Sequence, residues 1–185
     1  NGIDLFIRST GTTTLNHTKG ELEPLDGVDW HHIVWTQNGA ESVLYVDGVA
    51  DTADFNLNAF APTERFSDAT AVNTTSIGGI RRGAPSHWIT GLIDEVGIWK
   101  RTLSADEVVQ LFDNVTPFPQ ESGLREGLVS HWPLDDLQGG KAVDVVSGMN
   151  MDAINLSNAD VVEGKNGNAF SFDATKQTML ERLHA

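Results

Sequence analysis

The stretch 91–112, GLIDEVGIWKRTLSADEVVQLF, decides the fold class. Its first half is rich in β-branched and other apolar residues and has no proline, which predicts a strand from Gly91 to Trp99. The second half predicts a short helix, because Ser104 is a good N-cap and Glu107 follows three residues later, as in a capping box. A strand, a basic turn and a capped helix in this order indicate the end of a domain.

The rest of the sequence predicts short strands separated by turns. Asn38-Gly39 and Asp47-Gly48 are strong hairpin signals, so residues 30–52 predict a three-stranded meander. Residues 114–123, NVTPFPQESG, contain two prolines and are typical of a linker. Further strands are predicted at 3–8, 74–80, 128–134, 151–156 and 169–172. Many short strands with one short helix indicate an all-β sandwich or jelly roll.

Several segments resemble one protein family. GLIDEVGIWKRTLSADEV (91–108) resembles the C-terminal signature of bacterial laminin G-like, concanavalin A-type jelly-roll modules, which occur in large secreted proteins. DWHHIVWTQNGAESVLYVDGV (29–49) resembles the central hairpin of the same modules. Downstream, GLVSHWPLDD (127–136), DVVSGMNMDA (144–153) and GNAFSFD (167–173) resemble the start of such a module. The back half of the family pattern therefore precedes the front half in this sequence.

The resemblance implies a domain organisation. Residues 1–113 correspond to the C-terminal part of a laminin G-like module, 114–123 to a linker, and 124–185 to the N-terminal part of a second, or permuted same, module. In the family the first strand, here around Trp132, is the antiparallel neighbour of the last, here Ile93 to Trp99, and the linker would let them pair. The order fits either a window on a tandem array or a sequence with residues dropped between its segments. A tandem window leaves open sheet edges, so pairing with neighbouring copies is expected.

The composition argues against several kinds of partner and site. The net charge of −14 over 185 residues argues against nucleic acids and anionic membranes as partners, since these attract basic surfaces. The sequence has no cysteine, which excludes disulfides and thiolate metal sites, and no apolar run approaches the roughly 20 residues that span a bilayer. It begins at Asn1 without methionine or signal peptide, and we interpret it as a piece of a longer protein. We expect an extracellular or cell-surface location.

Acidic residues make calcium the expected cofactor. If the first and last strands pair, Asp94 approaches Asp135 and Asp136, while Asp144 lies in a loop dense in side-chain oxygens. Calcium takes roughly six to eight oxygen ligands, among them carboxylates and amides. Related modules often carry a structural calcium, so the resemblance implies Ca²⁺ with these four aspartates as candidate ligands. The alternative is that they are solvated turn residues or pair with nearby basic side chains.

Catalysis is not expected. Glycoside hydrolases need two carboxylates about 5–10 Å apart on either side of a sugar, and those with this fold carry them at alternating positions of one strand. Asp94 and Glu95 are adjacent, so on a strand they face opposite ways, and no third acid follows. The sequence therefore predicts a protein that is not an enzyme.

Sugar binding is the remaining active function. Sugars stack on aromatic faces and bond to polar side chains, and the best candidate is Trp88, with Arg81, Arg82 and His87 in the same loop. With the resemblance, this predicts a non-catalytic extracellular carbohydrate- or protein-binding adhesion module, whose partner is a glycan or a cell-surface protein. The alternative is a structural repeat that spaces or polymerises a surface protein through strand pairing between copies.

The calcium expectation leads to a simple test. If a bound ion stabilises the native state, excess chelator lowers the melting temperature, and added Ca²⁺ restores it, because a ligand that binds only the folded form raises its stability. Differential scanning calorimetry measures both shifts. An unchanged melt in excess chelator would reject a stabilising ion.

Overall fold

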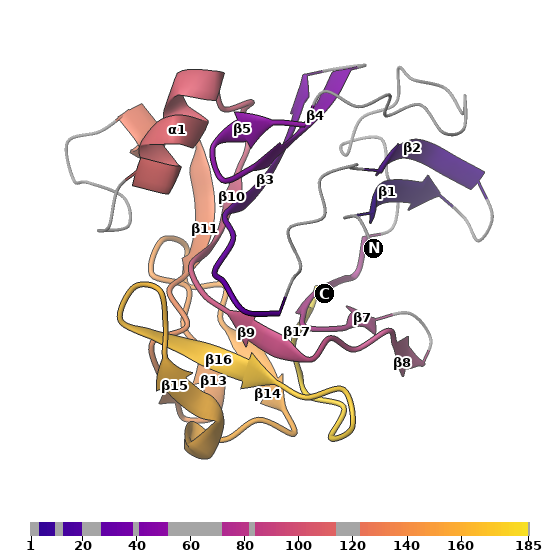
Figure 1. Cartoon of the computed structure of the whole chain (residues 1–185). Helices are drawn as coiled ribbons and strands as arrows, with labels where there is room; N and C mark the ends of the chain where they lie inside the picture. The colour runs from indigo at the N-terminus through magenta and orange to yellow at the C-terminus, as the bar shows by residue number, and fades with distance from the viewer. Residues whose placement is uncertain are drawn as a thin grey trace. The chain divides into compact units, whose positions relative to one another are not determined.

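The computed structural model consists mainly of short antiparallel strands (Figure 1). It describes residues 4–9, 13–19, 27–38, 41–51, 72–81, 84–113 and 123–184. Within them there is one α-helix, and no helix is long and apolar enough to cross a membrane. The expected all-β class with a single short helix is confirmed. The chain divides into two compact units, residues 1–71 with 102–115 and residues 72–101 with 116–185.

The first unit contains a strand pair, a meander and the helix. Its elements are β1 (Asp4–Ser9), β2 (Thr13–Lys19), β3 (Ile33–Asn38), β4 (Glu41–Val46), β5 (Val49–Ala50) and α1 (Ala105–Asp113). Strands β3, β4 and β5 form the predicted meander, and the positive φ of Asp47 (51°) and Gly48 (78°) suits the tight β4–β5 turn. The predicted capping box is present, because Glu107 N–H donates to Ser104 Oγ (3.2 Å) and Ser104 N–H to Glu107 Oε2 (2.9 Å).

The second unit holds the remaining strands in several small sheets. Its elements are β6 (Thr74–Ile77), β7 (Ile80–Arg81), β8 (Pro85–Ser86), β9 (Gly91–Ile93), β10 (Val96–Trp99), η2 (Gly123–Arg125), β11 (Leu128–Trp132), β12 (Leu137–Gln138), β13 (Lys141–Ala142), β14 (Met151–Ile154), η3 (Asn158–Asp160), β15 (Val161–Glu163), β16 (Asn168–Phe172) and β17 (Met179–Leu183). The largest sheet has the order β12-β13-β14-β17-β6, and a second has β15-β16-β9, with β9 and β16 side by side in Figure 1.

Strands from before and after the linker pair with each other inside the second unit. The expected antiparallel pairing of the first and last family strands is present as β10 with β11, in a register that places Val96 opposite Trp132. In addition, β9 pairs with β16 and β6 with β17. The strand pairing does not test whether residues 1–113 and 124–185 belong to two different copies of the family module. That assignment stays a prediction.

The strand predicted from Gly91 to Trp99 is in fact two strands. Glu95 has a φ of +54°, which interrupts the extended backbone, so that β9 ends at Ile93 and β10 begins at Val96. The two parts then join different sheets, β9 with β16 and β10 with β11. The sequence pattern missed this break because apolar residues continue on both sides of the Asp94-Glu95 pair.

The core of the second unit combines side chains from three of its sheets. It is a cluster of buried side chains contributed largely by β11, β13, β14, β16 and β17, namely Trp132, Leu134, Ala142, Met151, Phe170, Phe172 and Leu180. Phe170 and Phe172 alternate with the half-buried Ser171 on β16, as a strand with one buried face requires. Trp132, which the sequence places on a strand, is 2% exposed.

Two consecutive glycines make room for aromatic rings. A Cβ on Gly78 would collide with the buried ring of Phe172, and its φ is +84°, in the left-handed region that only glycine adopts without strain. A Cβ on Gly79 would lie 3.1 Å from Cδ1 of Trp88. The sequence Gly78-Gly79 is therefore explained by the close approach of a core ring and of a half-buried tryptophan.

Gly78→Ala is expected to lower the free energy of unfolding by about 3 kcal/mol or more, since left-handed strain adds to overpacking. Gly140→Ala is the matched control: its φ is +77° but no atom lies within 4 Å of the added Cβ. We expect a loss of only about 1 kcal/mol there. Urea denaturation followed by tryptophan fluorescence measures both, and equal losses would contradict the packing explanation.

Candidate functional site

The predicted sugar site falls on the β7–β8 hairpin of the second unit and the residues directly after it. Arg81 Nε donates to Glu181 Oε2 at 2.8 Å, so this guanidinium is engaged with β17. His87 is exposed, with a φ of +55°, and its Nδ1 lies 2.9 Å from Ser86 Oγ. Arg82 lies outside the described residues. The structure thus places three of the four predicted residues in one short segment, and of these three His87 is the most open to solvent.

Trp88 is half-buried beside this hairpin. Its ring lies against Gly79, as the 3.1 Å approach of a hypothetical Cβ shows, and the backbone here is tied down by a bond from Ile89 N–H to Gly78 O (2.9 Å). The indole Nε1 is buried, and no hydrogen-bond partner for it is found in the described residues. Trp88 as a residue is partly exposed, and its Nε1 contributes nothing to that exposure.

Two of the predicted calcium ligands instead hold a loop. Asp94 Oδ2 accepts from Asn166 N–H (2.9 Å), and Asp135 Oδ1 accepts from Asn168 N–H (2.8 Å). The side chain of Asn168 also donates to the Asp135 carbonyl at 3.0 Å. Asp94 and Asp135 therefore lie near each other and both bind backbone amides of the 164–168 turn.

The surroundings of Asp94 disfavour the ionised form of its carboxyl group. Burial raises its pKa to about 6, against the lowering effect of backbone hydrogen bonds from Asn166 and Lys165, and the charges of Glu95 and Asp135 raise it further. Its Oδ1 is buried, with no partner found among the described residues. A carboxyl with a raised pKa is a common mark of functional sites, yet here the other oxygen already accepts the turn amides.

Asp136 and Asp144 lie apart from that pair in their bonding. Asp144 is buried and accepts from the Ser147 hydroxyl and from the amides of His131, Val146, Ser147 and Met149. Burial works to raise its pKa, but these hydrogen bonds outweigh it and lower the pKa to about 2. Asp136 is exposed, and its Oδ2 accepts a hydrogen bond from Gln138 Nε2 at 3.3 Å.

The four aspartates therefore do not gather into one ligand set. Among the described residues no group of three or more His, Asp or Glu side chains is placed to hold a metal ion. The Asp144 carboxylate accepts hydrogen bonds from backbone amides, and those of Asp94 and Asp135 accept hydrogen bonds from amides of the 164–168 turn. Calcium stays a prediction that the chelator experiment tests.

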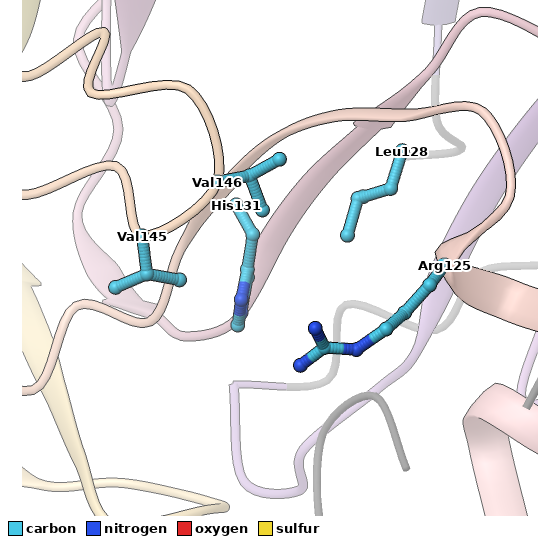
Figure 2. Close-up of a pocket in the computed structure, with 5 residues that line it drawn as sticks. All are labelled: Arg125, Leu128, His131, Val145 and Val146. Atoms are coloured by element: carbon cyan, nitrogen blue, oxygen red, sulfur yellow. The ribbon is translucent and has the colours of Figure 1, made fainter. Parts of the chain in front are cut away.

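A shallow hollow that sequence reasoning missed lies over β11. It has a volume of about 220 Å³ and is lined by Arg125, Leu128, His131, Val145 and Val146. Figure 2 shows His131 between Arg125 and Val145, with Val146 above His131 and Leu128 on the same side as Arg125. No sequence signal marks this set, because Arg125 follows the linker and the valines lie in a turn.

Hydrogen bonds fix the wall that carries Arg125. Arg101 Nε donates to Glu126 O (2.6 Å) and its Nη2 to Gly123 O (2.9 Å), while Trp99 Nε1 donates to Leu124 O (2.7 Å). These three bonds attach the η2 turn to the end of β10. Arg125 is therefore presented from a turn with a defined position.

The floor and opposite wall are held in the same way. His131 Nε2 is hydrogen-bonded to Glu95 Oε2 (2.6 Å), and Asn166 Nδ2 donates to Glu95 Oε1 (3.1 Å), which orients both the carboxylate and the imidazole. Val145 N–H donates to His131 O (2.9 Å), and Asp144 gathers the amides of the following turn. The valines consequently project from a turn that is organised around one buried carboxylate.

Asp94 gives a pH-dependent prediction. Because its pKa is raised above the ordinary value in the folded state, its contribution to stability is complete at low pH and is lost as the pH rises through about 6. We expect Asp94→Asn to remove about 1 kcal/mol of the stability decrease between pH 4.5 and 7.5, a value discounted for partial exposure. Asp136→Asn, at an exposed carboxylate, is the control and should keep the wild-type slope. Denaturant unfolding at several pH values measures how the free energy of unfolding depends on pH. The same dependence in Asp94→Asn as in the wild type would contradict the raised pKa.

Comparison with known proteins identifies the family. A family model described as the Concanavalin A-like lectin/glucanases superfamily, of the laminin G type, matches residues 1–109. No curated protein and no solved structure gives a significant match. The matched part covers more than half of the 185 residues and agrees with the antiparallel strands described above. The chain therefore belongs to the concanavalin A-like lectin/glucanase superfamily, as a laminin G-like member.

Proposed function

We propose that this protein is a non-catalytic, extracellular carbohydrate-binding module, in which Trp88 and His87 form part of the sugar-binding surface. Membership of a superfamily of lectins and glucanases supports a carbohydrate-binding type of module. The resemblance to modules of secreted proteins supports the extracellular location. A glycan on a cell surface is the partner that this proposal implies.

The partial exposure of Trp88, whose Nε1 is buried, is the observation that carries the proposal. A pyranose presents a face of C–H groups, which packs on an aromatic ring without leaving hydrogen-bonding groups unpaired. With Nε1 buried, the accessible part of Trp88 offers such a surface, and its support on Gly79 keeps the ring in place. His87, exposed next to it in the sequence, supplies a ring nitrogen that can bond to a sugar hydroxyl.

The bonding of the adjacent acids supports a module without hydrolase activity. Hydrolysis needs one carboxyl to protonate the leaving oxygen and another to attack or to activate water, with the sugar between them. Asp94 is bound to the 164–168 turn, and Glu95 is bound to His131 and Asn166.

The alternative, a structural repeat joined through strands of neighbouring copies, has less support. This alternative rests on the open edges of half a jelly roll. In the second unit β6, β9 and β10 each pair on one side with a strand from beyond the linker, so these sheets form within one molecule, while β6 and β9 stay at the ends of their sheets. The proposal of a binding module therefore does not depend on a second copy.

Glycan-array binding with variants of this segment tests the proposal. We expect Trp88→Ala to weaken binding about tenfold or more, as loss of one stacking surface predicts, and Trp88→Phe to retain most of it because a flat ring remains. His87→Ala should give a smaller loss. Melting temperatures of the variants distinguish lost binding from lost folding.

The outcomes are decisive in both directions. Equal binding by folded wild type and Trp88→Ala would remove Trp88 from the site. A folded wild type that binds no glycan on the array would contradict carbohydrate binding and favour the structural alternative. Release of reducing sugar from any bound glycan would contradict the non-catalytic assignment.

A further inference from the structure

The hollow over β11 differs in chemistry from the segment that carries Trp88. Three of its five lining side chains are aliphatic, and neither Trp88 nor His87 is among them. Val145 is 60% exposed and Val146 46% exposed, which is high for valines that sit next to each other. Arg125 and His131 are the two polar side chains that line it.

Arg125 gives the hollow its charge. It is exposed, and within the described part of the molecule its guanidinium has neither a hydrogen bond nor an ion pair. Other described arginines are engaged, such as Arg81 with Glu181 and Arg101 with two carbonyls. The carboxylate of Glu95 at the floor is hydrogen-bonded through both oxygens, to His131 and to Asn166, rather than to Arg125.

We propose that this hollow is a second binding site, which takes the carboxylate of an acidic aliphatic group of a protein partner. A glutamate side chain of the partner would place its two carboxylate oxygens on Arg125. The planar guanidinium can donate two parallel hydrogen bonds to these oxygens. The methylene groups of the bound residue would contact Leu128, Val145 and Val146.

Size and lining favour a peptide group over a sugar. The volume of about 220 Å³ is below the roughly 300–1,000 Å³ of sites for drug-sized ligands and suits one side chain. A sugar would set several hydroxyls against three aliphatic side chains, and a hydroxyl that loses water without a new partner is costly. The lining offers no amide or hydroxyl side chain to receive them.

Preorganisation supports a site rather than a chance depression. Bonds from Arg101 and Trp99 hold the turn that carries Arg125, Asp144 organises the turn that carries the valines, and Glu95 orients His131. Walls that are already ordered lose little conformational entropy on binding. A small contact area can then still give measurable, though weak, affinity.

NMR titration of the ¹⁵N-labelled protein tests the proposal. The probes are N-acetyl-glutamate amide and its neutral isostere N-acetyl-glutamine amide, with glucuronate as an acidic sugar. We expect the glutamate probe to shift the amides of His131, Val145 and Val146 saturably, with a Kd in the millimolar range, and the glutamine probe to bind about tenfold more weakly.

Two variants distinguish the contribution of the Arg125 guanidinium from the effect of the protein's net charge. Arg125→Gln should weaken the glutamate probe about tenfold, whereas Lys100→Gln, which makes the same charge change at an exposed residue outside the lining, should leave it unchanged. Equal effects of both variants, equal binding of both acetyl amides, or no shifts at about 20 mM probe would overturn the proposal. Tighter binding of glucuronate than of the glutamate probe would also overturn it, in favour of an acidic sugar. Arg125→Gln should keep its binding on the glycan array, because Arg125 does not belong to the proposed sugar surface at Trp88. The two proposals can therefore fail independently.

Discussion

The antiparallel pairing of β10 with β11 is the constraint on which the second unit depends. It joins residues on the two sides of the linker, and its register sets Val96 opposite Trp132, whose ring belongs to the core. The pairing also brings Glu95, just before β10, within hydrogen-bonding distance of His131 on β11. Loss of this ladder would therefore remove core packing and the floor of the hollow together.

Several carboxylates in this unit accept hydrogen bonds from backbone amides. Asp144 organises a turn, Asp160 caps η3 through Ser157, and Asp94 and Asp135 hold the 164–168 turn. A loop-rich sandwich leaves many amides outside its short ladders, and each buried amide needs a partner. Much of the acidity that suggests a cation site in the sequence is thus explained by loop architecture.

The sequence predicted those features that depend on local chemistry. The Ser104–Glu107 capping box, the Asp47-Gly48 turn and the family signature each depend on residues close together in the sequence, and each is present. The hollow could not be predicted, because Arg125 and Val145 are brought together only by bonds from β10 and from Asp144. The bonding of the aspartates escapes prediction for a related reason: a sequence shows which side chains have oxygen, but not which lone pairs the backbone already uses.

The charge of the whole molecule constrains what Arg125 can bind. A net charge of −14 repels an acidic partner at long range, while salt at about 0.1 M screens that repulsion beyond roughly 10 Å. The attraction to Arg125 acts only over a few ångströms, within a hollow whose other polar member, His131, is already bonded to Glu95. A polyacidic segment would gain one contact with Arg125 and would be repelled by the net negative charge of the molecule. The partner that fits is therefore one whose surface is otherwise neutral or basic and presents a single carboxylate on an aliphatic stem.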